Sequence, residues 1–183
     1  MKRLLLTAFL SLFFFNAVSA DALQQGNIIL FRHANAPGFG DPPQFQLGDC
    51  TTQRNLDDVG RTQAKRIGDY LRGEGVKVTR VLTSQWCRCK ETAALAFPNL
   101  PPQAIQEDPV FSSFFNERPQ EPQITAAAQA ILLAWKGPGV LVVVTHQVNI
   151  TALTNLFMQS GEGIVMRGQG KELKVLGRVL VGQ

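Results

Sequence analysis

The stretch V-L-V-V-V-T-H at residues 140–146 is the clearest sign of the fold. Five consecutive apolar residues, four of them valine, are typical of a strand that is buried on both faces of a parallel sheet. The sequence G-P-G at residues 137–139 ends any helix that precedes the run. We therefore place a central strand at residues 140–144, with Thr145 and His146 directly after its carboxyl end.

Two further apolar runs have the same character and also end in polar residues. The run N-I-I-L-F at residues 27–31 leads to Arg32 and His33, and T-R-V-L-T at residues 79–83 leads to Ser84 and then Arg88. Helices are expected at residues 56–71, 88–97, 124–135 and 149–157, and shorter strands within residues 103–110, 164–167 and 173–180. This alternation predicts a three-layer α/β/α sandwich around a largely parallel, mixed sheet.

The first 20 residues have the pattern of a secretory signal peptide. Lys2 and Arg3 precede an apolar run at residues 4–15, and N-A-V-S-A at residues 16–20 favours cleavage after Ala20. The apolar run is shorter than the roughly 20 residues that cross a bilayer. We expect residues 21–183 to form a single domain without a membrane span in the mature form, periplasmic or secreted.

The net charge of the mature domain argues against some classes of partner, and its cysteines predict a disulfide. Cleavage removes two of the 18 basic residues, which leaves 16 against 14 acidic ones, a net charge of +2. This small surplus argues against nucleic acid or an anionic membrane as a partner.

The three cysteines predict one disulfide, because two of them are expected to pair in an oxidising compartment. Cys87 and Cys89 are too close in sequence for an easy bridge, so Cys50 is expected to pair with one of them. Either pairing would tie the long loop at residues 35–55 to the turn that carries Arg88.

The polar residues that follow the three strands predict an oxyanion site. The carboxyl ends of parallel strands meet at one edge of a sheet, where ligands bind. Both histidines of the chain, His33 and His146, come to this edge together with Arg32 and Arg88. Two arginines buried together require an anion to neutralise them, so the sequence predicts a site for phosphate or a similar group. The cysteines and histidines lack the spacing of a zinc site, and we expect neither a metal nor a cofactor.

Four segments of the chain resemble the histidine phosphatase superfamily, which has the phosphoglycerate-mutase-like fold. The segments are L-F-R-H-A (30–34), L-D-D-V-G-R-T-Q-A (56–64), T-S-Q-W-C-R-C-K-E-T-A (83–93) and V-V-T-H-Q-V-N (143–149). Their order and spacing agree with the small single-domain members of that superfamily. Ala34 stands where many members have glycine.

The resemblance implies a metal-independent phosphomonoesterase. His33 would be the nucleophile that forms a phosphohistidine, and Arg32 and Arg88 would hold the phosphoryl oxygens. His146 would donate a hydrogen bond to the same group. The substrate would be a small phosphorylated molecule, and an envelope location favours a sugar phosphate, including those of the lipopolysaccharide core, or a scavenged phosphate ester.

The resemblance does not identify the general acid that protonates the leaving group. Gln147 follows His146 where some members of the superfamily have aspartate, and an amide cannot act as the acid. Glu117 is the candidate, with Asp108 and Glu107 as alternatives. An ion pair with the neighbouring Arg118 is an equally good interpretation of Glu117.

Three other interpretations remain open at this point. A mutase would need a lid for which a chain of this length has little material. A zinc protein would use the cysteines and a histidine. A phosphate- or phosphosugar-binding protein of the cell envelope, with weak or no turnover, would need the arginines but no nucleophile. Residues 111–122 are the expected specificity loop. Its Phe111, Phe114 and Phe115 either pack in the core or face a sugar ring, and we favour the core for all three.

Overall fold

Six strands form one mixed sheet in the computed structural model, which describes residues 23–181. Their order across the sheet is β3-β2-β4-β1-β5-β6. The four strands from β3 to β1 run parallel, and β5 and β6 pair antiparallel at one edge. The bounds are β1 (Ile28–Arg32), β2 (Val78–Thr83), β3 (Ile105–Glu107), β4 (Val140–Thr145), β5 (Gly163–Gln169) and β6 (Glu172–Val179). The predicted signal peptide at residues 1–20 lies outside the described residues.

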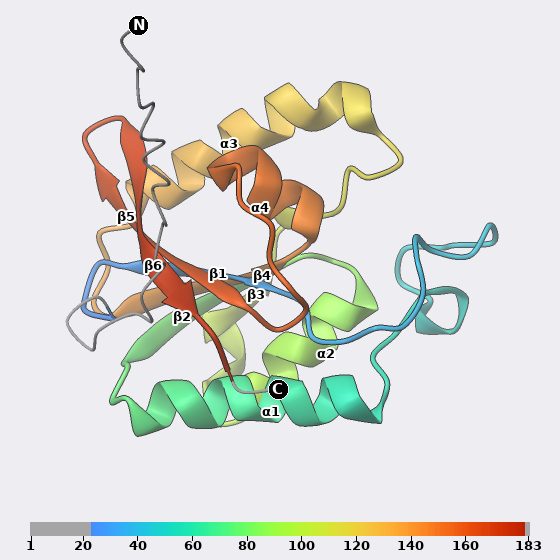
Figure 1. The fold of residues 1–183 in the computed structure, drawn as a ribbon, viewed down its shortest axis with the longest axis horizontal. Coiled ribbons are helices and arrows are strands. Elements are labelled where there is room, and N and C mark those ends of the chain that lie inside the picture. The colour runs from blue at the N-terminus through green and yellow to red at the C-terminus, as the bar shows by residue number, and fades with distance from the viewer. Residues whose placement is uncertain (1–22, 182–183) are drawn as a thin grey trace, which may run out of the picture.

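Two helices cover each face of the sheet. Figure 1 shows α1 (Asp58–Gly73) and α2 (Cys87–Ala96) on one side and α3 (Glu121–Ala134) and α4 (Gln147–Thr154) on the other. The expected three-layer α/β/α arrangement is therefore confirmed. Short 3-10 turns lie at Cys50–Thr52, Pro102–Ala104, Pro109–Phe111 and Arg118–Gln120. No helix within residues 23–181 has the length and apolar character needed to cross a bilayer.

Alternate residues of the central strands pack into two separate hydrophobic cores, one on each face of the sheet. Ile29 and Phe31 of β1 pack with Leu71 of α1 on one face, whereas Ile28 and Leu30 pack on the other face with α3 and α4. Successive side chains of a strand point to opposite faces, so a strand covered on both sides must be apolar throughout. This explains the unbroken apolar runs of β1 and β4.

The start of α1 holds the loop that follows β1. Asp57 caps the helix by accepting a hydrogen bond from the amide of Gly60 at 2.7 Å, and its second carboxylate oxygen accepts from the Asn35 side chain at 3.0 Å. A Cβ atom on Gly60 would lie 2.0 Å from the Asn35 carbonyl oxygen. Only glycine therefore lets the helix approach the backbone just after His33.

The residues after three strands stay in register beyond the sheet. The His33 amide donates to the Thr145 carbonyl at 3.0 Å, and the Ser84 amide donates to the Val144 carbonyl at 3.0 Å. These bonds extend the β1–β4 and β2–β4 ladders by one step. As predicted, the polar residues that follow these strands gather at one edge of the sheet.

A disulfide ties the first long loop to the start of α2. Cys50 pairs with Cys87, and Cys89 is a buried free thiol. The prediction that Cys50 is one partner is confirmed, and the structure decides which cysteine is the other. Burial raises the pKa of the Cys89 thiol to about 12, against a smaller opposing effect of Arg88, so this group stays protonated.

Candidate active site

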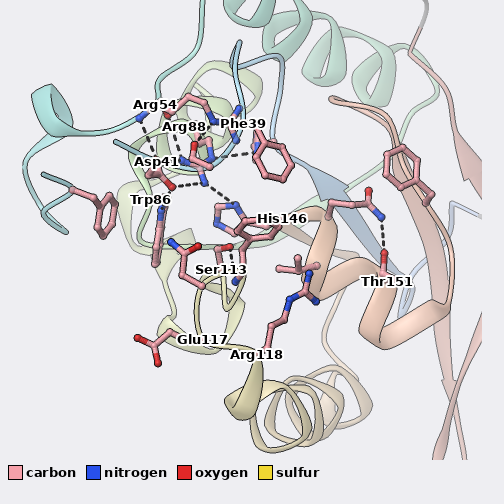
Figure 2. A pocket seen from close by; sticks show the side chains of 18 residues that line it. Phe39, Asp41, Arg54, Trp86, Arg88, Ser113, Glu117, Arg118, His146 and Thr151 are labelled. Carbon is pink, nitrogen blue, oxygen red and sulfur yellow. Dashed lines mark hydrogen bonds and ion pairs between the residues drawn. The ribbon is translucent and has the colours of Figure 1, made fainter. Parts of the chain in front are cut away.

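A pocket of about 500 Å³ opens at the carboxyl ends of β1, β2 and β4. His33, Arg88 and His146 lie in it, and loop residues from four segments complete its wall (Figure 2). The other lining residues are Phe39, Gly40, Asp41, Phe45, Arg54, Trp86, Ser113, Phe115, Asn116, Glu117, Arg118, Gln147, Val148, Thr151 and Phe157. The pocket lies where the strand order predicts a ligand site.

His33 is buried, neutral and held in one tautomer. Its Nδ1 atom lies 2.8 Å from the Ala34 carbonyl oxygen, and since a carbonyl only accepts, Nδ1 carries the proton. The Nε2 atom is therefore unprotonated, and its lone pair accepts a hydrogen bond from Arg88 Nε at 3.3 Å. Burial and then the charge of Arg88 lower the pKa of His33 to about 3. The imidazole thus presents an unprotonated nitrogen to the pocket at neutral pH.

Arg88 connects all the polar groups of the pocket floor. It lies in the first turn of α2, with only 3% of its surface exposed. Its Nε and Nη2 atoms donate to His33 Nε2 and His146 Nδ1 at 3.3 and 3.4 Å. Its Nη1 and Nη2 atoms contact Asp41 at 2.7 and 3.2 Å. One guanidinium therefore faces both imidazoles along one edge and a carboxylate at its end.

His146 has the opposite tautomer to His33. Its Nδ1 atom accepts from Arg88, so its proton is on Nε2, which lies 2.8 Å from the Ser84 hydroxyl. The two imidazole rings are 5.5 Å apart between centroids. Burial, followed by the charge of Arg88, lowers the pKa of His146 well below its usual value. Both histidines are therefore uncharged bases in a cationic pocket.

Arg32 lies beside the pocket and does not line it. Its Nη1 atom donates to the Met158 carbonyl at 2.9 Å, and its guanidinium lies over the Phe157 ring at 5.9 Å. Its Nε atom is buried without a hydrogen-bond partner among the described residues. The charge of Arg32 still contributes to lowering the pKa of His33, so its field reaches the site. A direct contact between Arg32 and a phosphoryl group stays a prediction.

Asp41 and Arg54 also line the pocket. Asp41 was not predicted from the sequence, whereas Arg54, just before the first helix, was expected either to line the substrate entrance or to pair at the surface, without a catalytic role. Asp41 accepts from both terminal nitrogens of Arg88, from the Trp86 indole at 3.0 Å and from the Arg54 amide at 3.2 Å. The Arg54 guanidinium donates to the carbonyls of Gly40, at 2.7 Å, and Ala36. Neither residue sits at the end of a strand. Only their place in the loop between β1 and α1 could have suggested them.

The three carboxylates considered as the general acid lie in different places. Glu117 is at the rim of the pocket, is exposed and accepts from Gln120 at 2.7 Å, and Figure 2 shows it away from His146. Asp108 caps a 3-10 turn, and Glu107 pairs with Lys90 on the surface at 2.8 Å. Glu117 alone of the three lines the pocket.

Five aromatic side chains line the pocket. Phe45 stacks on Trp86 at 5.1 Å between centroids, and Phe39 meets Phe115 edge-on at 5.1 Å. Phe157 is the fifth. Phe39 is 86% exposed, although a large apolar side chain usually avoids water. The pocket therefore has a charged floor and an aromatic mouth.

The specificity loop contributes less to the core than the sequence suggests. Phe111 and Phe114 are fully buried, as expected. Phe115 is only partly buried and lines the pocket, so its interpretation as a core residue was wrong. Phe115 instead packs edge-on against the exposed Phe39.

The charges of the floor suit a doubly negative oxyanion. Arg88 and Arg54 line the pocket and Arg32 lies beside it, whereas Asp41 supplies one negative charge and the histidines are neutral. These groups sum to +2, which matches a phosphate monoester dianion. The buried guanidinium edge and the unprotonated Nε2 atom of His33 form a site where an oxyanion can be bound and attacked.

The sequence matches a known family over a segment that carries part of this site. Residues 28–114 match the family described as Histidine phosphatase superfamily (branch 1). This segment contains His33, Asp41, Arg54 and Arg88. A comparison with curated protein sequences gives no match.

Solved structures of histidine phosphatases share the fold. The protein histidine phosphatase SixA complexed with tungstate is 16% identical with a TM-score of 0.60, covering 84% of this chain and 96% of its own. The α-ribazole phosphatase from Shigella flexneri is 15% identical with a TM-score of 0.58, covering 86% and 98%. A mycobacterial glucosyl-3-phosphoglycerate phosphatase in complex with VO3 is 16% identical with a TM-score of 0.61, covering 81% and 96%. At these identities the likeness concerns the fold.

Proposed function

We propose that the chain, which matches the histidine phosphatase superfamily over residues 28–114, hydrolyses a small phosphate ester through a phosphohistidine on His33. In this proposal the enzyme is exported and needs no metal, because guanidinium groups supply the positive charge at the phosphoryl group. The alternative is an envelope protein that binds phosphate esters without turnover. Such a protein would use the same arginines but would not need His33 as a nucleophile.

The unprotonated Nε2 atom of His33 is the observation that carries the proposal. The Ala34 carbonyl fixes the proton on Nδ1, and the low pKa keeps Nε2 unprotonated through neutral and mildly acidic pH. A binding protein would gain more from a protonated, cationic histidine. A neutral imidazole beside an arginine is instead arranged for nucleophilic attack.

The first half of the reaction transfers the phosphoryl group to His33. The Nε2 lone pair forms a bond to phosphorus as the bond to the ester oxygen breaks, and Arg88 stabilises the charge on the equatorial oxygens. His146 can donate to these oxygens only with a proton on Nδ1, which accepts from Arg88 in the unliganded structure. A bound dianion favours uptake of this additional proton from solvent because it stabilises the imidazolium form, and the proton returns to solvent when phosphate leaves.

The second half of the reaction returns the enzyme to its starting state. Water attacks the phosphohistidine, the phosphorus–nitrogen bond breaks, and the Nε2 lone pair is restored as phosphate leaves. Tungstate and VO3 in the neighbouring structures are oxyanions of the same general kind, which supports oxyanion binding in this fold.

The size of the pocket supports a small substrate. About 500 Å³ accommodates a phosphoryl group and one ring-sized alcohol. We propose a sugar phosphate, such as one of the lipopolysaccharide core, as the physiological class, because aromatic walls can pack on the carbon face of a sugar ring. One structural neighbour is named a glucosyl-3-phosphoglycerate phosphatase.

Export is proposed from the leader and the cysteines together. Residues 1–20 have the signal-peptide pattern, and the Cys50–Cys87 disulfide fits an oxidising compartment such as the periplasm or the exterior. Antibody detection of the mature chain in periplasmic and culture fractions tests this. A full-length chain confined to the cytoplasm would contradict it.

Turnover is tested with the mature chain, residues 21–183, and p-nitrophenyl phosphate in excess EDTA. We expect hydrolysis by the wild type and loss of at least about 1,000-fold with His33→Ala, since a missing nucleophile removes the covalent route. Loss of activity in EDTA that added metal restores would contradict the metal-free mechanism. A folded wild type that binds phosphate but releases no nitrophenol would favour the binding protein.

A further inference from the structure

The reaction proposed above lacks an evident proton donor, and the pocket offers two carboxylates among its described lining residues. These are Glu117, exposed at the rim, and Asp41, whose side chain is 12% exposed on the floor. Gln147, beside the second histidine, is an amide whose nitrogen donates to Thr151 and Leu156 and whose oxygen accepts from Met158. An alkoxide leaving group requires an acid at this end of the pocket.

We propose that Asp41 is the general acid of the reaction, an inference that rests on the proposed phosphohistidine mechanism. Asp41 replaces Glu117 in this role. The residue lies in the loop between β1 and α1, far in sequence from the positions where the acid was expected.

The geometry of Arg88 places nucleophile and acid at two ends of one planar group. The Nε atom faces His33 Nε2 at 3.3 Å, and the terminal nitrogens hold the Asp41 carboxylate at 2.7 and 3.2 Å. In-line transfer puts the leaving oxygen opposite the nucleophile. A phosphoryl group that lies along Arg88 from His33 therefore directs its leaving oxygen toward the side on which Asp41 lies.

Contacts other than the ion pair with Arg88 hold the Asp41 carboxyl group, so it stays in place when a substrate binds Arg88. The Trp86 indole donates to one carboxylate oxygen at 3.0 Å, and the Arg54 amide donates to the other at 3.2 Å. The disulfide joins the same loop to the residue before Arg88. These contacts hold the carboxyl group beside the pocket without an ion pair.

The substrate itself converts Asp41 from a base into an acid. Burial alone would raise the pKa of Asp41, but the hydrogen bonds and charge of Arg88, and after them the hydrogen bonds from the Arg54 amide and the Trp86 indole, hold it below its usual range in the unliganded structure. A phosphate dianion competes for Arg88 and adds negative charge beside the carboxylate, and both effects favour the protonated carboxylic acid. The Cys89 thiol and both imidazoles also face this region and are uncharged.

The proton balance of the reaction closes with this assignment. The ester binds as its monoanion and passes its proton to Asp41. As the phosphorus–oxygen bond breaks, the Asp41 carboxyl proton moves to the leaving oxygen, which departs as the alcohol. In the second half, the Asp41 carboxylate accepts a proton from the water that attacks the phosphohistidine, and this proton leaves with the phosphate monoanion.

Two esters that differ in leaving-group basicity test the proposal. Benzyl phosphate releases a basic alkoxide that needs a proton, whereas p-nitrophenyl phosphate releases a stable phenolate that does not. We measure the ratio of kcat/KM for benzyl to p-nitrophenyl phosphate in each protein preparation. Incomplete folding of a variant cancels in this ratio. The variants are Asp41→Asn, Asp41→Glu, Glu117→Gln and, as a control, Asp58→Asn, which removes a fully exposed carboxylate on α1.

We expect Asp41→Asn to lower the ratio by about 100-fold or more, the usual contribution of a general acid, and Asp41→Glu to restore most of it. Glu117→Gln and Asp58→Asn should leave the ratio unchanged. An equal loss with both esters in Asp41→Asn would show that Asp41 only positions Arg88 and would overturn the proposal, as would a fall in the ratio with Glu117→Gln. Failure of the wild type with both esters would instead contradict the proposed function.

Discussion

Removal of the Cys50–Cys87 disulfide should both destabilise the domain and slow the reaction. The bridge closes a loop with a sequence separation of 37 residues. In the chain-entropy treatment, a loop of this length lowers the entropy of the unfolded chain enough to stabilise the fold by about 4 kcal/mol at 25 °C. For a domain of this size, each kcal/mol shifts Tm by about 2–4 °C, so the double variant Cys50→Ser/Cys87→Ser should melt about 8–16 °C lower.

The effect on activity follows from what the bridge connects. The loop that contains Cys50 also carries Asp41 and Arg54, and Cys87 immediately precedes Arg88. The Cys87 amide donates to the Gln53 side chain at 3.0 Å, a second link between the same segments. Without the bridge, the pairing of Asp41 with Arg88 depends on weaker contacts. We therefore expect kcat/KM to fall by about tenfold at a temperature where the variant is fully folded, since small misplacements at a site are costly.

Thermal unfolding and p-nitrophenyl phosphate hydrolysis, each with and without dithiothreitol, measure both effects. Reduction should bring the wild type to the level of the double variant and leave the double variant unchanged. The buried Cys89 thiol stays protonated and does not take part in exchange. A Tm loss below about 2 °C would refute the entropic reasoning. A large Tm loss with unchanged activity would show that the bridge is a loop staple with no part in positioning Arg88.

Two further predictions concern the buried histidine and the aromatic mouth. The unfolded chain binds a proton on His33 below pH 6.5 that the folded chain, with its pKa of about 3, does not bind, so acidification from pH 7 to 5 should cost about 2 kcal/mol of stability through this residue. Chemical denaturation at both pH values should show this loss reduced in His33→Gln, and an equal loss in both proteins would contradict it. Phe39→Ala should raise KM for benzyl phosphate by about 5–20-fold, from lost ring packing, and leave acetyl phosphate unaffected. Leu47→Ala, on the same loop but outside the pocket lining, is the matched control, and equal effects of the two variants would refute a role for Phe39.

The sequence predicted the fold and the centre of the site because both depend on strands. Continuous apolar runs mark β1 and β4, and parallel strands bring their carboxyl ends together, so His33 and His146 could be placed side by side without coordinates. Arg88 followed from the turn after β2. The same reasoning gave the α/β/α layers.

The loop between β1 and α1 could not be predicted because it has no periodicity. Asp41 and Arg54 are held by a disulfide, by backbone carbonyls and by one another, and no regular spacing in the sequence encodes such contacts. The direction of the Arg32 side chain was likewise beyond the sequence. Its backbone position at the end of β1 allowed a place in the pocket, but its guanidinium instead donates to the Met158 carbonyl beside it.

The central claim is that His33 carries the phosphoryl group, and a rapid-quench experiment tests it most directly. Mature protein is mixed with p-nitrophenyl phosphate, quenched in alkali within the first turnover, digested and analysed by mass spectrometry. We predict one phosphoryl group on the peptide that contains His33, stable in alkali and lost in acid, and absent from His33→Ala. Turnover with no label on His33, or with the label on His146, would contradict the account.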